Sequence, residues 1–204
     1  MTEGLVRARN PRGEGRRLRE EILAAARMLL EGGSAETVTL RSVARKVGVS
    51  APSIYSHFGS RDEILQAIVE EAFDELEEAL SSVSEREPVA QLYAICDAYL
   101  LFAEQRPQRY QLMFGGLWNA AAAQANAGQS LDLSTLGLGA MTLFTNALRR
   151  CDEIRTPDGT SAPDRAAMLW VSLHGLAELR RTAPLFPWPV NIKRELIRRV
   201  ARLG

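Results

Sequence analysis

Apolar residues recur every three or four positions along one stretch of the chain, between Ile64 and Val83. This spacing places them on one face of an α-helix, whereas a strand would need strict alternation. Ser60 and Glu63 precede the stripe with the spacing of a capping box, which marks a helix start. The stripe comprises Ile64, Leu65, Ile68, Val69, Ala72, Phe73, Leu76, Leu80 and Val83. A long helix with one apolar face must pack against other elements, so it constrains what the rest of the chain can form.

The rest of the chain shows the same helical spacing, interrupted by glycines and prolines. Gly48 and Gly59 stand where two short apolar stripes end, and Pro88 and Pro163 stand where two longer ones begin. The predicted helical stretches are 18–30, 40–47, 51–58, 61–83, 88–106, 107–114, 131–150, 164–182 and 192–203. Residues 117–128 fit either a helix fragment or a mobile loop. Because no segment alternates like a strand, the sequence predicts an all-α protein of about nine helices.

Composition excludes several classes of protein. The 204 residues carry 25 basic and 25 acidic side chains, so no field of the whole molecule attracts nucleic acid or membrane. Cys96 and Cys151 form no CxxC motif and there are two histidines, which argues against a disulfide framework and a metal site. No apolar run approaches the roughly 18 residues of a membrane span, and the Arg-rich start lacks the apolar core of a signal peptide. We therefore expect a cytoplasmic protein without metal, cofactor or membrane partner.

Charge is distributed unevenly along the chain. Residues 1–61 carry 11 basic and 6 acidic side chains, residues 62–87 carry 1 and 10, and residues 88–204 carry 13 and 9. Such an asymmetry suggests a basic head that meets a polyanion and a body that does not. Charge alone favours a plainer alternative, in which the arginines of residues 7–19 form a solvated, partly disordered tail.

Two short predicted helices, 40–47 and 51–58, are separated by Gly48 and Val49. This spacing matches the helix-turn-helix, whose second helix enters the major groove of DNA. The surrounding run, TLRSVARKVGVSAPSIYSHFGSRDEIL over residues 39–65, closely resembles the DNA-binding signature of the tetracycline-repressor (TetR) family of bacterial regulators. The resemblance covers residues 15–65. It implies a ligand-responsive transcriptional regulator, most often a repressor, that binds a palindromic operator in double-stranded DNA as a homodimer and is released by a small-molecule effector.

The resemblance also implies a domain division and a set of DNA-binding residues. The domains are a basic flexible arm (1–14), the helix-turn-helix domain (15–61) and a ligand-binding and dimerisation domain (62–204). Thr39, Tyr55, His57 and Arg61 are expected to bind phosphates, and Arg41, Ser50, Ala51, Pro52 and Ser53 to meet base edges. Arg41 is the best specificity residue, because a guanidinium can bind guanine through two parallel hydrogen bonds. Without the surrounding motif, each residue has a plainer interpretation. Tyr55 could be an aromatic side chain packed in the core, and His57 a surface or packing histidine. Arg41 and Arg61 could be solvated charges on a helix surface.

In the resembled family the last two helices form the dimer interface, which corresponds here to 164–182 and 192–203. Trp170, His174 and Gly175 match a Trp-x-x-x-His-Gly pattern of a subset of these C-terminal domains, although a core histidine is the more frequent role for a residue like His174. The body is rich in aromatic and methionine side chains, which favours a cavity for an apolar or aromatic effector. The expected ligand-binding residues are Tyr99, Phe102, Tyr110, Met113, Phe114, Trp118, Met141, Phe144, Trp170 and His174.

Two other classes of function are weaker. An enzyme lacks support, because the sequence has no nucleophile constellation and no phosphate-binding glycine loop, and the acids at 70–78 have no histidine near them. An all-α interaction protein would use the three-helix head for protein contacts. It would show no salt-dependent binding to duplex DNA, which distinguishes it from a regulator.

Overall fold

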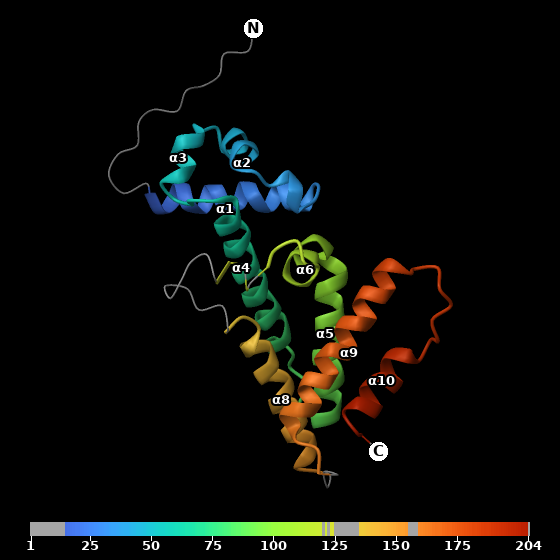
Figure 1. Cartoon of the computed structure of the whole chain (residues 1–204). Helices are drawn as coiled ribbons and strands as arrows, with labels where there is room; N and C mark the ends of the chain where they lie inside the picture. Colours follow the sequence, from blue (N-terminus) through green and yellow to red (C-terminus); the bar gives the residue numbers. More distant parts are fainter. Residues whose placement is uncertain (1–14, 120, 122, 125–134, 155–158, 204) are drawn as a thin grey trace. The chain divides into compact units, whose positions relative to one another are not determined.

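The computed structural model describes residues 15–119, 121, 123–124, 135–154 and 159–203. These residues form nine α-helices and one 3-10 helix and no strand, which confirms the predicted all-α class for the described part of the chain (Figure 1). They separate into two compact units, one built around the chain up to Ala72 and the other around the chain from Phe73. The predicted basic arm, residues 1–14, lies outside the described residues, as does much of the uncertain segment 117–128.

The first unit holds the N-terminal helices. It contains α1 (Gly15–Glu31), the 3-10 helix η1 (Ala35–Thr37), α2 (Leu40–Val47), α3 (Ala51–Tyr55), the first part of α4 (Arg61–Ser81) and α6 (Pro107–Phe114). Its core is aliphatic: Ile22, Val38, Val43 and Ile54 are fully buried. Phe58 closes this core, and the Arg19 guanidinium stacks 4.6 Å from the centre of its ring. Removing this apolar area from water is what holds helices as short as α2 and α3 in place.

The second unit is a helical bundle. It contains the end of α4, α5 (Pro88–Gln105), α8 (Leu138–Asp152), α9 (Ala162–Thr182) and α10 (Ile192–Val200). α5, α8 and α9 pack on one another, and α10 packs on α9 and α5. Arg165 is the notable polar group of its core: it is 3% exposed, pairs with Asp152 at the end of α8 and donates to the Ala201 carbonyl (3.2 Å). One side chain thereby joins the ends of α8 and α10 to α9.

Helix starts and ends follow the predicted glycines and prolines with three exceptions. α3 ends at Tyr55 rather than at residue 58, because residues 56–57 form a turn. α8 begins at Leu138 rather than at residue 131, because residues 135–137 form a turn and Gly137 adopts a left-handed φ of 79°. An added Cβ at Gly137 would lie 2.9 Å from the Trp170 ring, so this turn also needs the space that glycine leaves. α10 ends at Val200 rather than at residue 203, because Arg202 has a positive φ of 55°.

Neither unit contains a helix that is long and apolar enough to cross a membrane, as far as the structure describes the chain. The described residues also hold no group of three histidine, cysteine or acidic side chains arranged to bind a metal ion. Cys96 and Cys151 are buried free thiols, and burial raises the pKa of the Cys96 thiol far above its ordinary value.

Candidate functional site

Hydrogen bonds at both ends of α2 fix this helix and the turn that joins it to α3. The Ser42 N–H donates to Thr39 Oγ1 (3.1 Å) and the Thr39 N–H donates to Ser42 Oγ (2.9 Å), which completes a capping box at the start of α2. At its end, the N–H groups of Gly48 and Val49 both donate to the Ala44 carbonyl. Gly48 has a left-handed φ of 79°, and a Cβ added there would meet nothing within 4 Å. The turn therefore needs a glycine for its backbone torsion and not for space.

This turn leads into α3, a helix of five residues with one buried anchor. Ile54 is fully buried, while Ser50, Pro52 and Tyr55 are exposed and Ala51 and Ser53 are half-buried. Ser50 is the N-cap residue, but its hydroxyl is hydrogen-bonded to the Ser53 hydroxyl (2.8 Å) instead of to a backbone N–H. Both hydroxyls therefore lie at the exposed start of α3. The first turn of α3 faces solvent because its apolar contact is made by a single residue at its end.

Tyr55 and His57 follow at the end of this helix. The Tyr55 side chain is 57% exposed and so is not part of the core. His57 is half-buried and lies close to Gly15 at the start of α1. Both side chains can donate hydrogen bonds to an anion at this surface.

Arg61 is held by the protein itself. Its Nε donates to the Val38 carbonyl (2.8 Å), its Nη2 donates to the Ala35 carbonyl (2.7 Å), and its Nη1 lies 3.6 Å from Asp62. The side chain therefore ties the start of α4 to the segment before α2. Sequence reasoning missed this role, because neither carbonyl belongs to a recognisable motif.

The basic residues of α2 form a different group. Arg41, Arg45 and Lys46 are exposed, and within the described part of the chain none of them has an ion pair. Arg16 and Arg17 on α1, by contrast, pair with Glu20 and Glu21. α2 thus carries three positive charges that have no ion pair in the described residues, directly before the turn into α3.

In the second unit, three of the predicted ligand-binding residues form an aromatic cluster. The ring centres of Tyr99, Phe144 and Trp170 are 6.1–6.2 Å apart, in edge-on and tilted arrangements. Tyr99 and Phe144 are fully buried, and Trp170 is half-buried. Such contacts are those of a packed core. Met141 and His174 are half-buried in the same unit.

The remaining predicted residues do not join this cluster. Tyr110 and Phe114 of α6 belong to the first unit, with ring centres 5.0 Å apart, and Met113 is buried beside them. Trp118 is 9% exposed, and its buried indole N–H has no hydrogen-bond partner among the described residues. The single set predicted from the sequence is thus divided between the two units.

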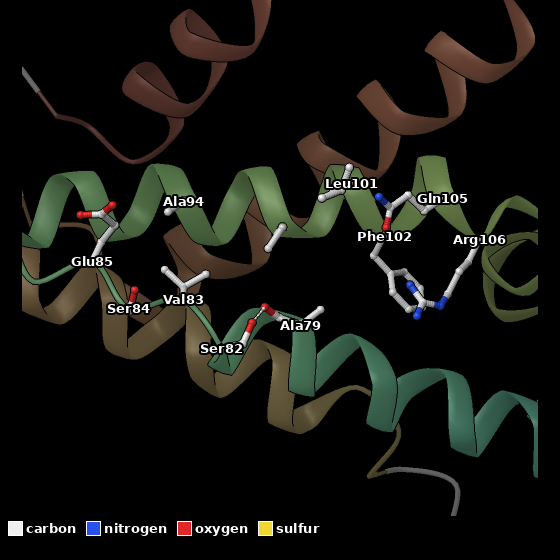
Figure 2. A pocket seen from close by; sticks show the side chains of 11 residues that line it. Ala79, Ser82, Val83, Ser84, Glu85, Ala94, Leu101, Phe102, Gln105 and Arg106 are labelled. Carbon is white, nitrogen blue, oxygen red and sulfur yellow. Dashed lines mark hydrogen bonds between the residues drawn. The ribbon is translucent and has the colours of Figure 1, made fainter.

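A groove of about 380 Å³ lies between the end of α4, the linker after it and α5 (Figure 2). Ala79, Val83, Ala94 and Ala98 leave the space, and Phe102 is the one residue of the predicted ligand-binding set that lines it. Figure 2 shows Arg106 beside Phe102 at one end; its guanidinium lies 5.5 Å from the ring centre and 3.0 Å from Glu75. The sequence pointed to large side chains, whereas this hollow exists because small ones face each other.

Comparison with known proteins identifies the family. Residues 22–68 match the profile described as bacterial regulatory proteins of the tetR family, and residues 92–203 match that of the tetracyclin repressor-like C-terminal domain. The chain belongs to the TetR family. It is therefore a TetR-family transcriptional regulator, and proteins of this family bind DNA and dimerise.

Curated relatives match part of the chain. The nucleoid occlusion factor SlmA of Idiomarina loihiensis is 30% identical over 102 residues, which are 49% of this chain and 52% of SlmA. SlmA of Photobacterium profundum is 29% identical over 100 residues, which are 48% of this chain and 51% of that protein. The chain thus matches about half the length of these curated relatives.

Solved structures extend the likeness to nearly the whole chain. A protein of unknown function from Rhodococcus sp. RHA1 has a TM-score of 0.71 at 25% identity, covering 91% of this chain and 92% of that one. SmeT, the repressor of a multidrug efflux pump of Stenotrophomonas maltophilia, has a TM-score of 0.63 at 21% identity, covering 91% and 89%. The TetR regulator PfmR of Thermus thermophilus has a TM-score of 0.60 at 20% identity, covering 89% and 95%. The last two show the shared fold.

Proposed function

We propose that this TetR-family regulator is a repressor that binds a palindromic operator as a homodimer, acts in the cytoplasm and is released by a small apolar effector. The observation that carries the proposal is the first turn of α3, which is exposed while Ile54 anchors the same helix in the core. A helix presented in this way can enter a major groove without unfolding the unit that carries it.

Each residue of this surface has a role that its chemistry allows. Arg41 binds a guanine edge through two hydrogen bonds, while Ser50, Ala51, Pro52 and Ser53 contact other base edges, the apolar pair by packing on thymine methyl groups. Thr39, Tyr55 and His57 bind phosphates. Arg61 is expected beside a phosphate too, but its hydrogen bonds to Ala35 and Val38 give it first the task of positioning this surface.

Dimerisation follows from the small size of α3. One short helix reads a few base pairs, whereas two copies related by a two-fold axis read two half-sites roughly 34–36 Å apart, or a multiple of that spacing. We place the interface on α9 and α10. α9 has exposed apolar side chains. Because an exposed apolar patch often marks a protein–protein interface, these side chains support this placement. On this proposal the body is of the Trp-x-x-x-His-Gly subgroup, with His174 half-buried on α9.

The effector is proposed to bind in the second unit, through the members of the predicted set that belong to it. One observation supports this: Phe102 lines the α4–α5 groove. An effector that prefers the conformation unable to bind DNA lowers operator affinity by its preference between the two states, typically about 1–3 kcal/mol. α4 is the element that both units share, so we assign the transmission to it.

Binding to labelled duplexes that tile the DNA flanking the protein's own gene tests the proposal by fluorescence anisotropy. We expect one duplex to bind with a steep loss of affinity as salt rises, because phosphate contacts release counterions. Arg41→Ala should weaken binding and flatten the preference among operator variants, whereas Arg16→Ala, which removes an arginine already paired with Glu20, should change little. Salt-independent binding, or none on any duplex, would instead favour a protein-interaction module.

A further inference from the structure

The groove between the end of α4 and α5 has an apolar floor. Ala79 of α4 and Val83 of the linker line it opposite Ala94 and Ala98 of α5 (Figure 2). Leu101 also lines the groove and is 50% exposed, so the groove holds apolar surface in contact with water. Its volume of about 380 Å³ lies within the range of sites that hold small organic molecules, roughly 300–1,000 Å³. The floor therefore suits the apolar body of a small ligand.

The two ends of the groove differ in charge, and Figure 2 shows Glu85 and Arg106 at these opposite ends. Arg106 is the one basic lining residue, and its guanidinium already lies 3.0 Å from Glu75 and 5.5 Å from the centre of the Phe102 ring. Glu85 is exposed and has no ion pair within the described part of the chain. The positive charge of the lining is thus offset by a neighbouring acid, whereas its negative charge is not.

Further acidic side chains flank the groove. Glu78 lies four residues before Ser82 on α4, and Glu104 lies three residues after Leu101 on α5, so each shares a helix face with a lining residue. Both acids are exposed, and neither has an ion pair among the residues that the structure describes. Arg86 is close in sequence but does not line the groove. These charges attract a cation and repel an anion.

The polar atoms at the acidic end favour one kind of cation. The Ser82 hydroxyl donates its proton to the Ala79 carbonyl (2.9 Å), so towards a ligand its oxygen can only accept. Ser84 adds a second hydroxyl beside Glu85. Hydroxyl and carboxylate acceptors bind an ammonium group through its N–H protons, which a quaternary ammonium lacks. The site therefore suits a protonated amine.

We propose that the α4–α5 groove binds a lipophilic amine, with its apolar body on the alanine floor and its protonated amino group at Glu85 and Ser82. The inference rests on the proposed function, because it takes this amine to be the effector. A ligand in the groove touches both α4 and α5 and so favours one spacing of these helices. Since α4 continues from the second unit into the first, that preference can distinguish two states of the regulator.

A small amine fits the groove better than a helical peptide of a partner protein does. One turn of an α-helix occupies roughly 400 Å³, so the groove could hold about one turn, which offers few anchors. Charged side chains also stand at both ends of the apolar floor, whereas a helix lying along a groove needs an apolar track that continues past it.

Calorimetric titration of the full chain with four naphthalene compounds tests the ligand class. The compounds share one apolar body: 1-naphthylmethylamine, its trimethylammonium analogue, 1-naphthylmethanol and 1-naphthylacetate. We expect the amine to bind about tenfold more tightly than the alcohol and about threefold more tightly than the quaternary cation, with the acetate weakest. Added salt should reduce the advantage of the amine over the alcohol, because it screens the acidic side chains.

Substitutions test the position of the site. Glu85→Gln should weaken binding of the amine about fivefold and leave that of the alcohol unchanged, since only the amine uses the carboxylate. Glu153→Gln is the matched control, because Glu153 is an exposed acid of the same unit that lies after α8, and it should change neither. Ala98→Phe should abolish binding of both compounds by filling the floor, with circular dichroism to check the fold.

Operator binding measured by anisotropy connects the groove to regulation. The amine should release the wild-type protein from its operator duplex, and Glu85→Gln should need about fivefold more amine for the same release. Glu153→Gln should respond as the wild type does. Operator binding that the bound amine leaves unchanged overturns its role as the effector.

The outcomes separate the inference from the proposed function. Equal affinity for the amine, the alcohol and the acetate overturns the inference alone, as does amine binding that Glu85→Gln and Ala98→Phe leave unchanged. A basic amphipathic peptide that binds while none of the four compounds does would assign the groove to a protein partner and overturn it too. If no duplex binds, the proposed function fails, while selective binding of the amine that both variants weaken would still support the groove as an amine site.

Discussion

Two helix pairs of this protein expose opposite kinds of surface. α2 and α3 are joined by a tight turn and present hydroxyls, a tyrosine and three basic side chains that have no ion pair among the described residues. α9 and α10 are joined by a long connector, and the connector and one face of α9 expose aliphatic and aromatic side chains. The first surface suits a hydrated polyanion, and the second suits a surface that also loses water on contact. The contrast shows that the chemistry left exposed, more than the helical fold shared by both pairs, indicates the class of partner.

The largest expected effect tests whether the helix pair α9 and α10 depends on the buried ion pair between Arg165 and Asp152. Arg165→Met leaves Asp152 without its partner and removes the hydrogen bond to Ala201, so we expect a loss of about 3–5 kcal/mol in unfolding free energy. Urea denaturation followed by circular dichroism measures it. Arg180→Met, an exposed arginine on the same helix, is the control. A loss below about 1 kcal/mol would show that α8, α9 and α10 are held together without this contact.

The second prediction concerns Ile54, the buried side chain that anchors α3 in the helix pair α2 and α3. Ile54→Ala removes the one fully buried side chain of α3 and should cost about 2–5 kcal/mol, with DNA binding lost before the body unfolds. Ile54→Val, which keeps most of the side chain, should cost about 1 kcal/mol. Anisotropy and circular dichroism on the same samples separate the two losses. Equal DNA affinity in both variants would mean that α3 is not the reading element.

A smaller effect distinguishes a contact with DNA from a contribution to the stability of the fold. Tyr55→Phe removes one exposed hydroxyl and should weaken operator binding about tenfold, the equivalent of one hydrogen bond to a charged phosphate. The unfolding free energy should stay within about 0.5 kcal/mol of the wild type. Tyr93→Phe on α5 provides a hydroxyl deletion away from this surface. If both substitutions weaken binding alike, Tyr55 has no specific contact with DNA.

The smallest expected effect is a pH dependence of the unfolding free energy, caused by Glu178 on α9. The hydrogen bond from Arg181, with a smaller contribution from the nearby charge, lowers the pKa of Glu178 in the folded state. Glu178 therefore stabilises the fold above its unfolded pKa, and this contribution is lost as the pH falls through its folded pKa. We expect Glu178→Gln to cost a few tenths of a kcal/mol at pH 7, and this cost should decrease as the pH falls below the unfolded pKa of Glu178. Urea denaturation at a series of pH values measures it, and a cost that does not decrease at low pH would assign the effect to packing.

Most of the fold could be predicted from the sequence because its determinants are local. Helical spacing, caps and breakers located the helices, and the Thr39 cap and Gly48 were read with their correct roles. The exposure of α3 followed from the same short run. Features that depend on distant residues could not be found this way: the Arg61 carbonyl contacts join positions more than 20 apart, and the α4–α5 groove needs four alanine and valine positions to face each other.

The same limit explains the predicted ligand-binding set. The set was chosen by residue type, aromatic or methionine, but residue type does not reveal whether a ring packs on its neighbours or lines a space. Tyr99 and Phe144 are packed in the core, whereas Phe102 reaches a groove formed by small neighbours.

The turn at Gly48 has a consequence for sequence variation. Because an added Cβ at Gly48 would meet nothing within 4 Å, another side chain is disfavoured there only by the positive φ of the backbone. A library randomised at this codon and selected for operator binding should return glycine most often, then asparagine and aspartate, with valine and isoleucine rarest. Enrichment ranked by side-chain volume instead would show that some unseen neighbour occupies that space when DNA is bound.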